Sequence, residues 1–136
     1  MLIPLLNAIY IAFTSNGTLT SAIPNGVHRD QAPESLALPY VVTHVINSAI
    51  EYSYAGVCRS HVHVRFSLFG VGHDATGSLC ETLVSQFDDQ LLTLSGTSVN
   101  DSVTRLTEPT PKLHRHDAGG NDVWEWNVVY EYGIQQ

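Results

Sequence analysis

The segment HVHVRFSLF, residues 61–69, alternates polar and apolar residues without interruption from His61 to Leu68. Because successive side chains of a β-strand point to opposite faces of the sheet, this pattern predicts a strand with one buried and one polar face. The polar set holds two histidines and an arginine, and the apolar set consists of Val62, Val64, Phe66 and Leu68. The segment therefore predicts a sheet that covers a hydrophobic core on one side.

Further strands are expected on both sides of this segment. Residues 39–46 form a run rich in β-branched side chains, which favour strands. We expect this run to pair with residues 61–69 as an antiparallel hairpin that closes through the aromatic stretch 51–56. Three short strands and one long strand are also predicted, at 27–29, 99–107, 113–116 and 123–134.

The last of these strands carries two tryptophans, Trp124 and Trp126, on the same face as Tyr130 and Tyr132. Two roles fit this aromatic stripe. The side chains can pack in the core of the subunit, or part of the stripe can close a contact between subunits, where Trp and Tyr concentrate.

A helix is predicted over residues 2–13, which are almost wholly apolar. Its apolar residues follow the i, i+3, i+4, i+7 spacing of an amphipathic helix, namely Leu2, Leu5, Leu6, Ile9 and Phe13. The opposite side, with Ile3 and Ile11, is also apolar, and a helix of this kind is buried on more than one side. We expect the second cover to come from a neighbouring chain.

A second helix is predicted over residues 79–91, where a leucine or phenylalanine recurs every four residues. Ser78 and Glu81 have the spacing of a capping box, and Asp74 is an alternative N-cap. The order helix, strands, helix, strands predicts one α+β domain over residues 1–136. Its sheet is expected to be mostly antiparallel, with the two main helices packed on one face.

The charge and composition of the chain argue against some classes of function. The 136 residues carry a formal net charge of -7, which argues against binding to nucleic acid or to an anionic membrane. Only 14% of the residues are charged, which suggests that partners cover part of the surface. No Lys or Arg precedes Arg29 and the N-terminal apolar run breaks at Thr14, so neither a signal peptide nor a membrane span is expected.

Histidines suggest a metal site, because His61 and His63 project from the same face of a strand. His73 and His114 are candidates for a third ligand. No acidic residue occurs in residues 65–70 directly after the pair, and a usable site needs three or four ligands. We therefore expect ordinary polar histidines and no cofactor, with a small metal-dependent enzyme as the alternative.

Nucleophilic catalysis has no motif in this sequence, which lacks a Gly-x-Ser-x-Gly elbow. Cys58 and Cys80 do not have the spacing of a redox or zinc motif. They are expected to be buried free thiols, and a disulfide between them is the other reading. The chain is therefore predicted not to be an enzyme.

Nearly the whole chain resembles the tail completion (tail terminator) proteins of long-tailed bacteriophages. The most specific short match is Pro39-Tyr40-Val41, at the entry into the first long strand. The N-terminal apolar helix, the alternating strand at 62–69, the helix at 79–91 and the closing aromatic strand at 124–132 follow in the order of that family.

The resemblance implies a ring, expected to be a homohexamer, at the head-proximal end of the tail tube. Such a ring ends tube polymerisation and joins the tail to the connector (stopper) protein on the head side. DNA would pass through its lumen without being held, and the protein would be assembled in the host cytoplasm and reside in the virion. The alternative in the same class is another neck or minor tail protein of similar fold.

Two sets of residues are candidate contact sites. Residues of the apolar helix and the aromatic strand form the candidate subunit interface, namely Leu2, Leu5, Ile9, Phe13, Trp124 and Trp126. The candidate loop for contacts with neighbouring proteins contains Glu51, Tyr52 and Tyr54.

Overall fold

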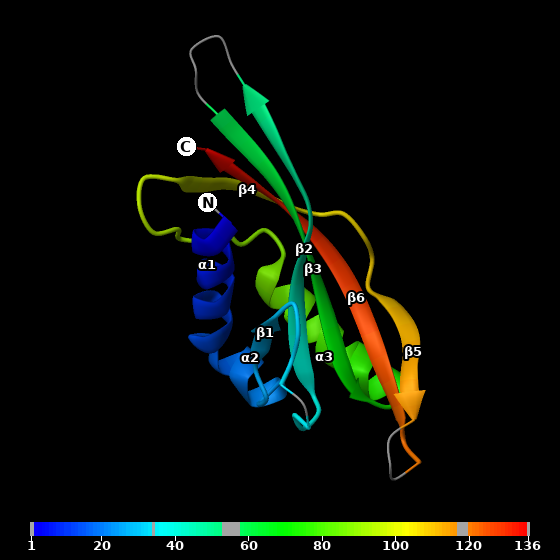
Figure 1. Cartoon of the computed structure of the whole chain (residues 1–136). Coiled ribbons are helices and arrows are strands. Elements are labelled where there is room, and N and C mark those ends of the chain that lie inside the picture. The colour runs from blue at the N-terminus through cyan, green and yellow to red at the C-terminus, as the bar shows by residue number, and fades with distance from the viewer. Residues whose placement is uncertain (1, 34, 53–57, 117–119, 136) are drawn as a thin grey trace.

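The computed structural model describes residues 2–33, 35–52, 58–116 and 120–135 (Figure 1). Its elements, in chain order, are α1 (Leu2–Thr14), α2 (Gly17–Ala22), β1 (Val27–Arg29), β2 (Tyr40–Tyr52), β3 (Cys58–Val71), α3 (His73–Phe87), β4 (Val99–Arg105), β5 (Thr110–His116) and β6 (Asp122–Gln135). The predicted α+β class is confirmed, because one mostly antiparallel sheet packs against helices.

The sheet has the strand order β1-β2-β3-β6-β4, and β5 pairs with β6 beyond the end of β4. The predicted antiparallel hairpin of β2 and β3 is confirmed, and both strands are longer than expected. Among the described strands, only β1 and β2 pair in parallel. Between β4 and β5 the Leu106 N–H still donates to the Val129 carbonyl at 2.8 Å, so both strands follow the same edge of β6.

All three helices lie on one face of the sheet, as Figure 1 shows, and the core fills the space between. The apolar face predicted for residues 61–69 is confirmed, because Val62, Val64 and Leu68 are fully buried beneath the helices. Ser67 was expected on the polar face and is nevertheless buried, since its hydroxyl donates to the Asn127 side-chain oxygen at 2.6 Å. The sheet therefore has one apolar face and one polar face.

The first helix begins and ends close to its predicted bounds, but α2 was missed. Its six residues, GTLTSA, have weak helix propensity. The Asn16 side chain caps α2 by accepting a hydrogen bond from the Leu19 N–H at 3.1 Å, and Leu19 is buried in the core. No helix in the described part of the chain is long and apolar enough to cross a membrane.

The bounds predicted for the second main helix were wrong. Helix α3 begins directly after Gly72, whose φ of 84° favours glycine, and it ends at Phe87. Ser78 and Glu81 consequently lie within the helix and form no capping box. Leu91 follows the helix and is exposed, because Asp89 has a φ of 57° and turns the chain away.

Helix α3 and strand β6 are in close contact at Gly77. A Cβ atom added to Gly77 would lie 2.8 Å from Cζ2 of Trp126, which is well inside ordinary van der Waals contact. The absence of a side chain at this helix position therefore leaves room for the indole of Trp126.

We expect Gly77→Ala to destabilise the fold by about 1–3 kcal/mol, because the overpacking at Trp126 exceeds the gain in helix propensity. Gly17→Ala is the matched control, since no atom lies within 4 Å of the added Cβ there. Urea unfolding of both variants measures the difference. A Gly77→Ala protein as stable as the wild type would show that the indole does not constrain the helix.

Candidate assembly surfaces

The outward side of α1 is an exposed apolar surface. Ile3 is 67% exposed, Ile11 is 61% exposed and Tyr10 is 51% exposed. The helix contains no charged residue. Large apolar side chains that gather on one surface of a small domain are typical of a contact with another molecule. Within the subunit only one side of the helix is buried, and the predicted cover of the other side by a neighbouring chain stays a prediction.

The candidate interface residues of α1 lie mostly on its other side. Leu5, Ile9 and Phe13 are almost fully buried in the core of the subunit itself, and Leu2 is 38% exposed. A neighbouring chain can therefore reach Leu2 but not the other three. The side of α1 that carries Ile3 and Ile11 is the one open to contact.

A groove runs between α1 and residues 90–95, which follow α3. It consists of three successive hollows of about 180, 220 and 220 Å³. The first and second share Ala12, Leu91 and Leu92, and the second and third share Ala8, Ile11 and Thr93. Ligand pockets usually measure about 300–1,000 Å³, so each hollow is small for a cofactor or substrate. None of the side chains that line the hollows is ionisable.

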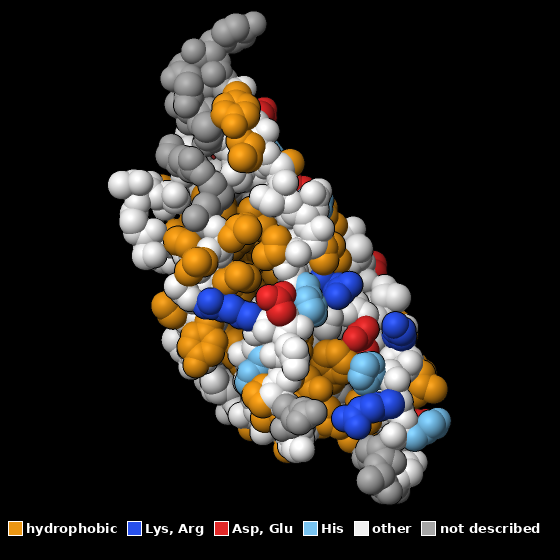
Figure 2. Space-filling view, in the orientation of Figure 1, with side chains coloured by type: hydrophobic (Ala, Val, Ile, Leu, Met, Phe, Trp, Pro, Cys, Tyr) orange, Lys and Arg blue, Asp and Glu red, His pale blue; other side chains and the backbone are white. Residues whose placement is uncertain are grey.

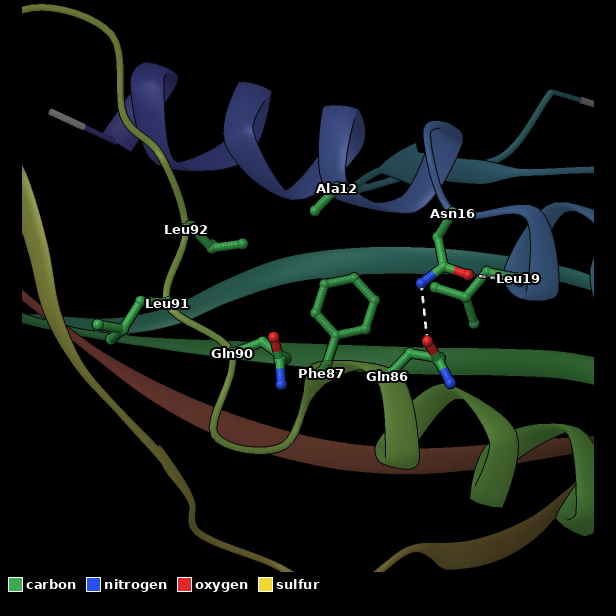
Figure 3. Close-up of a pocket in the computed structure, with 8 residues that line it drawn as sticks. All are labelled: Ala12, Asn16, Leu19, Gln86, Phe87, Gln90, Leu91 and Leu92. Atoms are coloured by element: carbon green, nitrogen blue, oxygen red, sulfur yellow. Dashed lines mark hydrogen bonds between the residues drawn. The ribbon is translucent and has the colours of Figure 1, made fainter.

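Figure 3 shows the end of this groove at the start of α2. Phe87 and Leu92 extend toward Ala12 of α1, and all three side chains line the hollow. The Asn16 amide donates to the Gln86 side-chain oxygen at 2.8 Å and links the start of α2 to α3. The groove is therefore a neutral, largely apolar channel with a polar end.

The second exposed surface is the part of β2 beyond the body of the molecule, residues 46–52, which we call the hairpin extension. Every residue of the extension is exposed, including Ile46, Ile50 at 57% and Tyr52 at 74%. Its outer edge has no strand partner among the described residues, because β1 pairs only with residues 41–43. Figure 1 shows this hairpin projecting past the helices.

The register shows which face of the extension is apolar. Ile50 lies opposite Ser60 and Tyr52 lies opposite Cys58, so both side chains project from the helix side of the sheet. Glu51 projects from the other face. Figure 2 shows apolar side chains on the projecting hairpin and on the body beneath it, whereas most charged side chains lie lower on this face.

The candidate contact loop differs from its prediction. Glu51 and Tyr52 belong to strand β2, because the ladder with β3 continues to the pair Tyr52 and Cys58. Tyr54 lies outside the described residues. The two described candidates therefore form the end of a regular hairpin.

Trp124 and Trp126 are half-buried and lie beside the first turn of α3. The His73 ring meets both indoles edge-on, with centroid distances of 4.8 and 5.1 Å. Trp126 also packs against the core. Because α1 packs on α2 and β1 instead, the six candidate interface residues do not form one patch.

The polar face of the sheet holds a cluster of histidines and carboxylates. The His61 ring lies between two acids, with Nδ1 2.9 Å from Glu131 and Nε2 3.0 Å from Glu51. His63 Nε2 lies 3.2 Å from the other oxygen of Glu131. Sequence reasoning missed both carboxylates because it considered only residues just after His63, whereas Glu51 comes from β2 and Glu131 from β6.

The metal alternative receives no support from this geometry. His73 contacts the two tryptophans, and His114 meets the Phe69 ring at a centroid distance of 4.9 Å, so neither joins the cluster at His61. In the described residues no group of three or more His, Cys, Asp or Glu side chains could hold a metal ion.

Cys80 is a buried free thiol, as predicted. Burial raises its pKa to about 11, so the thiol stays protonated at neutral pH and is a poor nucleophile. The side chain of Cys58 lies outside the described part of the structure.

A virion protein shares this fold. A chain in the structure of the virion of a native gene transfer agent (GTA) particle superposes with a TM-score of 0.81. The match covers 99% of this chain and 97% of that chain, at 14% sequence identity. No family model and no curated protein matches the sequence. The similarity therefore shows a common fold across the whole length of both chains.

The protonation state of His61 gives a prediction for pH. A neutral imidazole has one N–H, so both ring nitrogens can donate to the two carboxylates only when the ring is protonated. The hydrogen bond to Glu51, with a further contribution from Glu131, raises the pKa of His61 above its ordinary value of 6.5. The resulting stabilisation is complete below about pH 6.5 and is lost as pH rises through the higher pKa of the folded state.

NMR titration of the histidine side chains measures this pKa. We expect a value above 6.5 for His61 in the wild type and a lower one in Glu51→Gln. Glu81→Gln, an exposed change on α3, is the matched control and should leave the value unaltered. An unperturbed His61 in the wild type, or an equal shift in both variants, would contradict the bridging role.

Proposed function

We propose that this chain is a structural protein of a phage-like virion, and specifically the tail terminator. It forms a ring, a homohexamer, at the head-proximal end of the tail tube. The observation that carries this proposal is the whole-chain similarity to a chain of a virion structure, at a TM-score of 0.81. The order of sequence elements that resembles the tail completion family is consistent with it.

The surfaces of the subunit support a role in assembly. The outward side of α1 and the hairpin extension expose apolar side chains at two separate places, which suits a subunit with several protein neighbours. A terminator needs such contacts with its own copies, with the tail tube protein and with the head-side connector.

The charge is compatible with the passage of DNA. A subunit with a net charge of -7 repels phosphates, and DNA is held mainly by the release of counterions from a basic surface. A ring of such subunits lets DNA through the lumen without retaining it. In this proposal the ring is assembled in the host cytoplasm and remains in the virion.

Deletion of the gene from the phage-like genome that encodes this chain tests the proposal. Without a terminator, tube polymerisation has no stop, so electron microscopy should show tails of irregular and excessive length that do not join heads. Expression of the wild-type chain from a plasmid should restore uniform length. Tails of normal length that fail to join heads would instead assign the chain to another position in the neck.

A further inference from the structure

We propose that the hairpin extension of one copy, residues 46–52, lies in the groove beside α1 of the next copy. Ile50 and Tyr52 would occupy hollows of the groove and contact Ile11 and Leu91 of the neighbour. This inference rests on the proposed ring and specifies one of its contacts.

The hairpin extension requires a partner for two reasons. Its helix-side face exposes Ile50 and Tyr52 beyond the reach of the helices that cover the rest of that face. Its outer edge also presents unpaired backbone groups, which favour association with another chain. Exposure of these apolar side chains and backbone groups to water is unfavourable, and contact with another protein surface would bury them.

The other face of the extension is already fixed to its own subunit. Glu51 on that face contacts His61, and His61 contacts Glu131 on β6. These contacts link β2, β3 and β6 across the polar face. The opposite, apolar face of the extension has no such contacts with the described residues and is free to enter a groove.

The groove matches the extension in size and polarity. Each hollow of about 180–220 Å³ accommodates one side chain such as Ile or Tyr, whereas a drug-sized ligand needs more space. The side chains directed to the helix side from residues 48, 50 and 52 are Ser, Ile and Tyr, and the groove lining is neutral as well.

Charge favours a second copy of this chain as the occupant. Two subunits that each carry -7 repel each other, so the least costly contact joins surfaces that hold no acidic side chain. The groove and the helix-side face of the extension are two such surfaces, and one contact between copies covers both. A foreign partner on either surface would leave the other exposed in every subunit.

The contact is head-to-tail, because the two surfaces are different parts of the chain. A heterologous contact of this kind repeats from copy to copy and closes into a ring when the rotation permits. Such a ring needs only this one repeated contact and no symmetric dimer.

Cysteine cross-linking tests the contact directly. Two proteins are prepared in a Cys58→Ser background, one with Ile50→Cys and the other with Ile11→Cys, and both replaced residues are exposed. Cys80 is buried and does not compete. After oxidation of an equal mixture we expect a disulfide-linked pair that contains one chain of each kind, and a ladder of multimers from the protein that carries both substitutions.

Serine substitutions measure the strength of the same contact. We expect Ile50→Ser and Ile11→Ser each to raise the dissociation constant of the assembly at least about tenfold in sedimentation experiments. Leu113→Ser is the matched control, because Leu113 is a comparably exposed apolar residue on β5, away from both surfaces. Circular dichroism confirms that each variant folds.

The outcomes separate this inference from the proposed function. Wild-type rings without the mixed cross-link, or an Ile50→Cys protein that links to itself as well as to its partner, would overturn the hairpin contact alone. A wild-type chain that stays monomeric at every concentration would overturn the ring as well.

Discussion

Strands β3 and β6 pair without a register shift from Arg59 opposite Gln135 to Val71 opposite Val123, and the remaining elements take their positions from this pair. The pairing places Val64, Phe66 and Tyr130 on one face, where they are buried beneath the helices. It places His61, His63 and Glu131 on the other. The helices therefore cover one face of the sheet, and the other face is polar.

The sheet is longer than the helical layer that covers it. Helix α3 packs on β3 and β6, while α1 packs on α2 and β1, so the far end of the β2–β3 hairpin has no helix above it. The same arrangement buries only one side of α1 and exposes the other. The exposed hairpin and the half-covered helix therefore have the same cause, which is the short helical layer. Both surfaces are neutral although the chain is acidic, and this makes contact between copies favourable.

Much of the fold could be predicted from periodicity. The strict alternation at 61–68 predicted the central strand, and the aromatic alternation predicted β6, because both strands have one face in the core. Helix α2 was missed because its stability comes from the Asn16 cap and the burial of Leu19, which propensity does not show. The end of α3 was misplaced because Leu91 continues the apolar spacing although the backbone turns at Asp89.

The contact surfaces were only partly predictable. An apolar helix face without charge was visible in the sequence, but its spacing alone did not show which side the core would take, and the core took Leu5, Ile9 and Phe13. The carboxylates beside His61 come from two other strands, so only the register of the sheet brings them together. The same holds for the groove, whose walls are separated by many residues of chain.

Negative-stain electron microscopy of the purified wild-type chain tests the central claim, that the exposed neutral surfaces of the subunit are covered by further copies of it. The account predicts closed rings of a single copy number with a central hole. A uniform field of single subunits at concentrations where the chain is otherwise stable would contradict it.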